Sequence, residues 1–296
     1  MIMSVGLKHE EDVRTIMFEI SLFAAYVAFW NTCAFAISDL LKFCIVSLQC
    51  FQSAVVVHNC AHAHPFKSPS HNYIFFLILT LLSGAPVSLY VPGHNQAHHK
   101  HLESEHDATC TRKMQYNSDF LNFILYVPTV VPRVILNEQR YMMRKFGTWI
   151  FRQYVQELLA YYSFLAMLLL LDWKKAMFVY FLPTLLGKFC ILSLNMLQHF
   201  KCDPQSEYNH SRNFTGSVLN YVFMNNGYHT VHHNAPGLHW SKLPAKHLEI
   251  QHKIDPDLIQ SSIVQYTYQT HFKPNVQVYT KQFLSTTMFS HAPRER

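Results

Sequence analysis

The stretch YIFFLILTLLSGAPVSLYV, residues 73–91, decides how the rest of the chain can be arranged. It is apolar enough to enter a membrane, but Gly84 and Pro86 would break a straight helix. Clustered histidines stand on both sides of it, beginning at His58 before it and at His94 after it. If the stretch crossed a membrane once, these histidines would lie on opposite faces and could not share a metal. We therefore predict that residues 73–91 form an interfacial or re-entrant segment.

The composition indicates a membrane protein. Of the 296 residues, 50% are hydrophobic, 15% are aromatic and only 14% are charged, whereas a soluble domain has about 25% charged residues. A transmembrane helix needs about 20 apolar residues. Four segments approach that length, namely residues 16–37, 40–57, 154–171 and 176–198. Short turns join them in pairs, so we predict an all-α integral membrane protein with four transmembrane helices in two hairpins.

This topology places every histidine cluster on one side of the membrane, because an even number of crossings separates each cluster from the next. Residues 58–153 and 199–296 would form a helical cap on that side, within a single domain of residues 1–296. Basic residues are concentrated between the two hairpins, so the positive-inside rule puts the cap in the cytosol. Within the cap, residues 133–152 mix arginine with apolar residues and are predicted to lie along the membrane surface.

Histidine is the outlier in the composition. The chain has 20 histidines, more than its 18 acidic residues, and most of them are clustered. Clustered histidine suggests metal binding. His58 and His62 stand four residues apart at the end of the second predicted span. A helix that continued past the bilayer would present both on one face, which suits two ligands of one metal.

A second cluster lies in the string GHNQAHHKH, residues 93–101. His94 and His98 are again four residues apart, which predicts one helix face, and His99 would be turned about 100° around the axis. One helix could then serve two metals.

A third cluster, His229, His232 and His233, has i, i+3 and i+4 spacing and is predicted to lie on one helix face. At the end of the fourth predicted span, His199 adds one more imidazole. Asn195, four residues before it, supplies an amide that could hold a water ligand.

These histidines fit two metal ions. Neutral nitrogen ligands suit iron better than magnesium or calcium, which prefer oxygen. Zinc is chemically possible, but four-coordinate zinc would leave one ligand unused and would not explain the membrane setting. Asn59 and Asp107 could orient ligand N–H groups, as hydrogen-bond partners of metal-bound histidine do. The predicted ligands are His58, His62, His94, His98, His99, His199, His229, His232 and His233.

The motifs HNCAH, HNQAHH, NMLQH and HTVHH together resemble the membrane fatty acid desaturase superfamily, over residues from about 16 to 250. The resemblance implies that the same nine histidines bind two iron ions on a four-span, cytosol-facing bundle, with Asn195 near a water ligand. Two features depart from the commonest pattern: Asn59 stands where many desaturases have Asp, and the second motif is HxxxHH rather than HxxHH. The stretch NNGYHTVHHNAPGLHWSKLPAKH is similar to a bacterial branch that includes alkene-forming fatty-acid decarboxylases.

The resemblance implies O₂-dependent oxidation of a fatty-acyl chain, with desaturation as the first hypothesis. The alternatives are oxidative decarboxylation to a terminal alkene and hydroxylation of an alkyl or acyl chain. A non-enzyme alternative is a histidine-rich membrane metal transporter, but transport predicts polar residues at the membrane midplane, and these histidines stand at span ends.

The partners follow from the same resemblance. The substrate would be a fatty acid or an acyl thioester, and O₂ would be the co-substrate. No haem-binding HPGG segment or flavin fingerprint is visible, so we expect a separate electron donor, either a ferredoxin or a haem cytochrome with its reductase. The net charge of +6 is better explained by anionic lipid than by nucleic acid. The expected location is a bacterial inner membrane or the endoplasmic reticulum.

Overall fold

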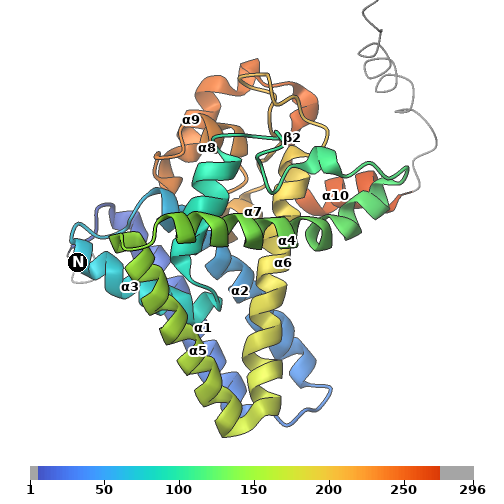
Figure 1. Ribbon diagram of the computed structural model, residues 1–296. Coiled ribbons are helices and arrows are strands. Elements are labelled where there is room, and N and C mark those ends of the chain that lie inside the picture. The colour runs from blue at the N-terminus through green and yellow to red at the C-terminus, as the bar shows by residue number, and fades with distance from the viewer. Residues whose placement is uncertain (1–5, 274–296) are drawn as a thin grey trace, which may run out of the picture.

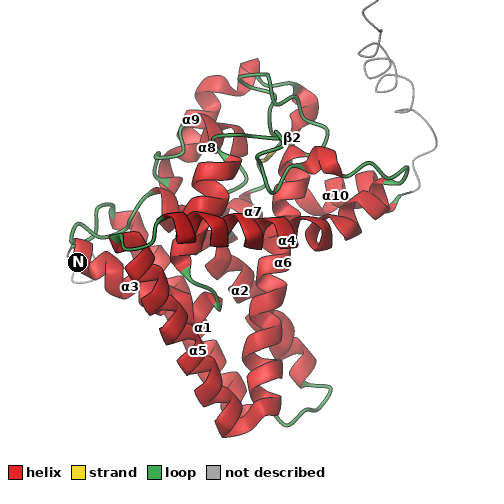
Figure 2. Cartoon of the chain, viewed as in Figure 1, coloured by secondary structure: helices red, strands yellow, loops and turns green. Residues whose placement is uncertain are grey.

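The fold is mostly helical, as predicted (Figures 1 and 2). The structure, a computed structural model, describes residues 6–273. Its α-helices are α1 (Val13–Thr32), α2 (Asp39–His62), α3 (Pro69–Ser83), α4 (Asp119–Arg144), α5 (Trp149–Lys175), α6 (Leu182–His199), α7 (Ser217–Val222), α8 (His229–Asn234), α9 (Leu243–Ile250) and α10 (Ile263–Thr267).

Shorter elements connect these helices. Two strands, β1 (Asn213–Phe214) and β2 (Ile259–Gln260), pair in parallel. Three segments are π-helices: η4 (Val91–His98), η6 (Ala176–Phe181) and η10 (Tyr268–Phe272). The 3-10 turns are η2 (Glu10–Asp12), η3 (Val87–Leu89), η5 (Thr111–Lys113), η7 (Trp240–Lys242), η8 (Gln251–Lys253) and η9 (Pro256–Leu258).

Four helical segments within residues 6–273 are long and apolar enough to cross a membrane. The number equals that predicted, but one of the four, Asp119–Arg144, lies in the predicted cap and was not predicted as a span. Their bounds differ from the predicted spans. They are Glu10–Thr32, Asp39–His62, Asp119–Arg144 and Trp149–His199.

The first predicted span, residues 16–37, is too long at its end, because α1 stops at Thr32. Asp39 explains this early stop: its carboxylate accepts hydrogen bonds from the backbone N–H groups of Ala34 and Ala36, at 2.9 and 3.0 Å, and holds the connection in a turn.

The third and fourth predicted spans, residues 154–171 and 176–198, lie within the 51-residue segment Trp149–His199. That segment is not straight. Asp172 has extended backbone angles, φ −164° and ψ 100°, and its carboxylate accepts the N–H groups of Lys174 and Lys175 at 3.0 and 3.1 Å. Figure 1 shows the chain reversing at this lower end, so that α5 and α6 run in opposite directions.

Helix α4 lies across the upper end of the bundle formed by α2, α5 and α6 (Figure 1). The stretch predicted to follow the membrane surface, residues 133–152, is not one element. It comprises the end of α4, a turn with Gly147 at φ +79°, and the start of α5. The turn separates two helices because this glycine adopts a left-handed conformation that other residues rarely adopt.

The break predicted within residues 73–91 is present. Helix α3 ends at Ser83, and Gly84 follows in the left-handed conformation with φ +71°. Its N–H still reaches the carbonyl of Thr80 at 3.0 Å, which caps α3. The helical segments Pro69–Ser83 and Val87–His98 are bent by 93° relative to each other. That this segment is interfacial or re-entrant stays a prediction.

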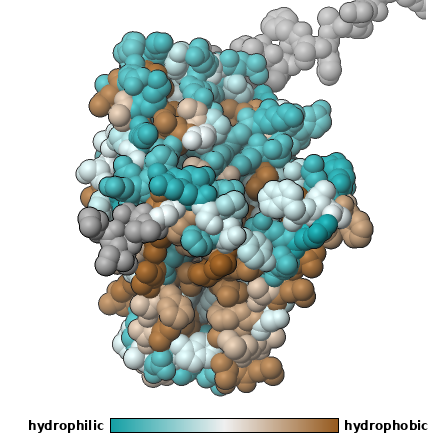
Figure 3. All heavy atoms as spheres, turned by 90° about the vertical axis from the view of Figure 1, so that its left-hand side faces the viewer, coloured by the Kyte–Doolittle hydropathy of each residue, from teal (hydrophilic) through white to brown (hydrophobic). Residues whose placement is uncertain are grey.

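The surface divides into an apolar lower part and a hydrophilic upper part (Figure 3). Many large apolar side chains of the bundle are exposed, among them Phe23, Leu41, Leu159 and Leu170. Because contiguous exposed apolar surface of this kind marks contact with lipid or another protein, the lower part and the four long apolar helices fit an integral membrane protein.

Helices α2 and α6 pack closely at Gly187. A Cβ atom at this position would lie 2.6 Å from the backbone carbon of Cys50. We expect Gly187→Ala to lower the free energy of unfolding by about 1–3 kcal/mol, because this overpacking outweighs the better helix propensity of alanine. Thermal unfolding of the purified protein in detergent measures the change. Gly237→Ala is the control, since no described atom lies within 4 Å of a Cβ there; an equal midpoint for both variants would contradict the prediction.

Candidate metal centre

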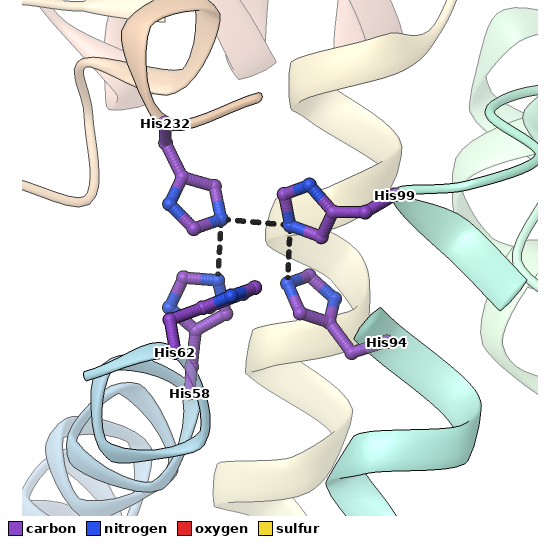
Figure 4. A group of neighbouring side chains, drawn as sticks. All are labelled: His58, His62, His94, His99 and His232. Carbon is purple, nitrogen blue, oxygen red and sulfur yellow. Dashed lines mark hydrogen bonds between the residues drawn. The ribbon is translucent and has the colours of Figure 1, made fainter. Parts of the chain in front are cut away.

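Five of the predicted ligands form a first histidine group (Figure 4). Their potential ligand atoms all lie within 4.8 Å of one another. The Nε2 atom of His232 is 3.0 Å from that of His58 and 3.0 Å from that of His99. The first group consists of His58, His62, His94, His99 and His232.

The other four predicted ligands form a second histidine group, again with ligand atoms within 4.8 Å of one another. The Nε2 atom of His199 is 3.2 Å from that of His98 and 2.9 Å from that of His229. His229 Nε2 is also 3.2 Å from His233 Nε2. The second group consists of His98, His199, His229 and His233.

The second motif supplies both groups, but not as predicted from α-helical spacing. His94 and His99 lie in the first group, and His98 lies in the second. The reason is that this segment is a π-helix, in which the N–H of His99 bonds to the carbonyl of His94 five residues earlier, at 3.0 Å. A π-turn brings residues i and i+5 onto one face, so the expected pairing of His94 with His98 is wrong.

The third motif is also divided between the two groups. His232 belongs to the first group, whereas His229 and His233, four residues apart on α8, belong to the second. The expectation that all three share one face is therefore wrong. The short helix α8 lies between the groups, with neighbouring side chains directed to different groups.

The loop before α8 is fixed by close backbone packing. The N–H of Phe214 donates to the carbonyl of Gly227 at 2.8 Å. Asn213 holds Thr230 from two directions: its carboxamide oxygen accepts the N–H of Thr230 at 3.0 Å, and its amide donates to the Thr230 hydroxyl at 2.8 Å. Because these bonds join β1 to the first turn of α8, they set the position of the third motif.

Two of the histidines use their Nδ1 N–H to donate to a group that can only accept. His98 Nδ1 is 3.0 Å from a carboxylate oxygen of Asp107. His199 Nδ1 is 3.1 Å from the backbone carbonyl of His210. In the neutral rings of His98 and His199 the proton is therefore on Nδ1, and Nε2 presents a lone pair to the group. His58 Nδ1 contacts both the amide oxygen of Asn59 at 3.1 Å and the amide nitrogen of Asn226 at 3.3 Å, so Asn59 and Asn226 together orient this ring.

This proton assignment tests whether the residues fit a metal. His98 and His199 both carry the proton on Nδ1, so their Nε2 atoms, 3.2 Å apart, face each other with lone pairs. Two lone pairs cannot form a hydrogen bond, and a cation between them removes the repulsion. Imidazole nitrogens bind a divalent ion at about 2.1 Å, so neighbouring ligands of one ion stand about 3 Å apart. Both histidine groups therefore fit metal ions.

Burial keeps the histidines of α8 neutral. It lowers the pKa of His229, His232 and His233 well below the ordinary value, and nearby histidines lower it further. Neutral imidazole is the form that binds a metal, so these side chains are ready to act as ligands at physiological pH.

Asp107, predicted as an orienting residue, is fully buried against His98. Burial alone would raise its pKa, but His98 and hydrogen bonds from Thr109 hold the pKa below its ordinary value. The carboxylate accepts bonds from His98 Nδ1 and the N–H of Glu103 on one oxygen, and from the N–H and hydroxyl of Thr109 on the other. It therefore fixes the ring of His98 to the loop that follows the second motif.

Replacing Asp107 by asparagine puts an amide donor where the carboxylate accepts, so at least one of these bonds is lost. We expect Asp107→Asn to weaken metal binding about 10- to 100-fold, measured by metal titration of the purified protein. Glu105→Gln is the control, because Glu105 is exposed and its carboxylate lies near the equally exposed His106, outside both histidine groups. Equal metal affinity in both variants would argue against this role of Asp107.

Asn195 lies one turn before His199, and its amide donates to the hydroxyl of Tyr126 at 2.8 Å. Its predicted role near a water ligand stays a prediction. His210 and Asn226 were not predicted to belong to the site. The carbonyl of His210 accepts from His199 at 3.1 Å, and the Asn226 amide is 3.3 Å from His58 Nδ1. Asn226 lies in the quoted stretch that contains the third motif, three residues before His229, whereas His210 lies outside every motif and acts through its backbone carbonyl.

Comparison with known proteins agrees with this geometry. A family model described as fatty acid desaturase matches residues 40–261. A sphingolipid delta(4)-desaturase of Komagataella phaffii is 24% identical over 218 residues, which cover 66% of this chain and 56% of the relative. The chain thus spans little more than half the length of that curated relative. Because the family match covers most of the chain and includes all four histidine motifs, the resemblance seen in the sequence is confirmed, and the chain belongs to the fatty acid desaturase family.

Proposed function

We propose that this protein is a membrane di-iron oxidoreductase that desaturates a lipid acyl chain. The observation that carries the proposal is the pair of histidine groups, each with potential ligand atoms within 4.8 Å of one another. In the second group the Nε2 lone pairs of His98 and His199 also face each other. Family membership and the relative's name, sphingolipid delta(4)-desaturase, favour desaturation over hydroxylation or decarboxylation. Two bound irons, supplied with O₂ and electrons, would provide the power to oxidise an unactivated C–H bond, which side-chain acids and bases lack.

The protein's own residues would perform three tasks. The first and second histidine groups would each hold one ion. Asp107 and the carbonyl of His210 would keep the proton on Nδ1 of His98 and His199, so that Nε2 stays free to bind, and Asn59 would orient the ring of His58. The burial of these histidines excludes water from the oxidising site.

The position of the groups supports an enzyme rather than a transporter. His62 is the last residue of α2 and His199 is the last residue of α6. The centre therefore lies at the ends of two candidate spans, whereas a transport site is expected near the membrane midplane. We propose that this end faces the cytosol, where a separate electron donor can reach it.

Product analysis tests the reaction. Cells that express the full chain are given defined fatty acids and sphingoid bases, and their lipids are analysed by gas chromatography and mass spectrometry. We expect a product that has lost two hydrogens from adjacent carbons. A hydroxylated chain, or a terminal alkene shortened by one carbon, would replace desaturation by one of the alternatives. Purified protein should contain about two irons per chain; zinc alone would contradict the di-iron proposal.

A further inference from the structure

A long apolar groove lies among α1, α3, α5 and η6, away from the histidine groups. Its volume is about 620 Å³. Figure 1 shows α1, α3 and α5 close together on the left of the bundle. None of the nine predicted metal ligands lines this groove. It is therefore separate from the candidate metal centre.

The dimensions of the groove suit an extended hydrocarbon chain. Along α1 its lining runs from Ile16 to Asn31, which corresponds to about 22 Å at 1.5 Å per residue. The hydrocarbon core of a bilayer is about 30 Å thick, so the groove is longer than one leaflet. The hydroxyls of Tyr26 and Tyr180, which line it, are bonded to the carbonyls of Leu82 and Leu81 at 3.1 and 2.7 Å. The walls thus offer apolar and aromatic surface.

One acidic side chain stands among the residues that line the groove. Glu19 lines the groove near the cap end of α1 and is only 3% exposed. One carboxyl oxygen, Oε2, accepts a hydrogen bond from the hydroxyl of Ser53 at 3.0 Å. The other, Oε1, is buried and has no hydrogen-bond partner among the described residues. An unsatisfied buried carboxyl oxygen costs free energy, and an ionisable residue within a membrane span is a candidate for a binding site.

We propose that this groove binds one chain of a bilayer lipid that carries an N–H or O–H donor near its polar end, and that Glu19 Oε1 accepts that hydrogen bond. The position of Glu19 fits this role, because α1 begins only six residues earlier, at Val13. A lipid whose hydrocarbon chain lies in the groove would have its polar end at the same depth in the membrane as Glu19. Lipids that carry an amide and hydroxyl groups where the hydrocarbon chains begin, such as ceramides, provide this hydrogen-bond donor. The ester groups of phosphatidylcholine can only accept a hydrogen bond. The proposal does not depend on the proposed reaction.

Photo-crosslinking of the purified full chain tests the proposal. The probes are a ceramide and a phosphatidylcholine, each with a diazirine in the acyl chain, added to protein in phosphatidylcholine nanodiscs. We expect the ceramide probe to label peptides of α1 and α3, and unlabelled ceramide to compete. Equal labelling by both probes would overturn the proposal, because it would indicate nonselective lipid contact. Labelling confined to peptides that carry the histidine motifs would also overturn it.

Two pairs of variants sharpen this test. Glu19→Leu removes the acceptor and should reduce ceramide labelling about tenfold, whereas Glu19→Gln keeps an acceptor oxygen and should retain most of it. Ile78→Trp fills the groove and should reduce labelling severalfold. Ile74→Trp is its matched control, since Ile74 and Ile78 are 54% and 46% exposed on the same helix and only Ile78 lines the groove. Equal labelling across all four variants would contradict the proposal.

A final variant distinguishes the groove from the reaction site. His232→Ala should leave ceramide labelling unchanged while the metal centre is impaired. Loss of labelling in this variant would mean that the probe reports the metal centre, and the groove proposal would fail even if the proposed reaction were correct. Circular dichroism and size-exclusion chromatography of every variant show that the protein compared is folded.

Discussion

We expect His232→Ala to abolish the oxidised acyl product of the proposed reaction and to reduce bound iron to about one ion per chain or less. His232 joins the members of the first histidine group, because its Nε2 atom lies 3.0 Å from those of both His58 and His99 (Figure 4). Alanine removes this ligand atom. Loss of a residue that only orients a ligand lowers metal affinity or activity about 10- to 100-fold. We therefore expect removal of a ligand itself to lower them by more than about a hundredfold.

The measurements for this variant are iron content per chain and product formation in cells, normalised to the amount of folded protein. His106→Ala is the matched control, because His106 is exposed and belongs to neither histidine group. It should keep both iron and product. Unchanged iron and product in His232→Ala would reject the ligand assignment.

Gly227→Ala should cost about a hundredfold in activity although it changes no predicted ligand. A Cβ atom at this position would lie 2.0 Å from the carbonyl oxygen of Phe214 and 2.7 Å from the side-chain oxygen of Asn220. The Phe214 carbonyl cannot easily move, because it accepts the Asn220 amide at 2.7 Å. The strain is relieved only by shifting the loop that leads into α8, which begins two residues later at His229. A displacement of about 1 Å at a reacting centre can cost a hundredfold in rate.

Product formation and iron content of Gly227→Ala are compared with those of Gly237→Ala. The two glycines flank α8, and a Cβ at Gly237 would meet no described atom within 4 Å. The control should therefore behave as the original protein. If Gly227→Ala retained full activity, the backbone contact with Phe214 would not be what positions the third motif.

The sequence by itself determined the class of the protein and the position of the break between α3 and η3. Apolar runs and the small fraction of charged residues report the membrane setting directly. Gly84 and Pro86 act on their own backbone, so the break after Ser83 could be predicted from local chemistry. The nine histidines were recognised because their spacing is also local, and the structure brings all nine together. Their role as iron ligands stays a prediction.

Only the tertiary structure decided which histidines share a group. The π-helix pairs His94 with His99, a geometry that spacing rules based on the α-helix do not contain. The contact between His98 and His199 joins positions 101 residues apart. The acceptor for His199 is a backbone carbonyl, which every residue carries and no motif can mark. Local periodicity fixes which side chains share a helix face, but the division into two groups depends on how distant helices pack, and that packing appears only in the folded chain.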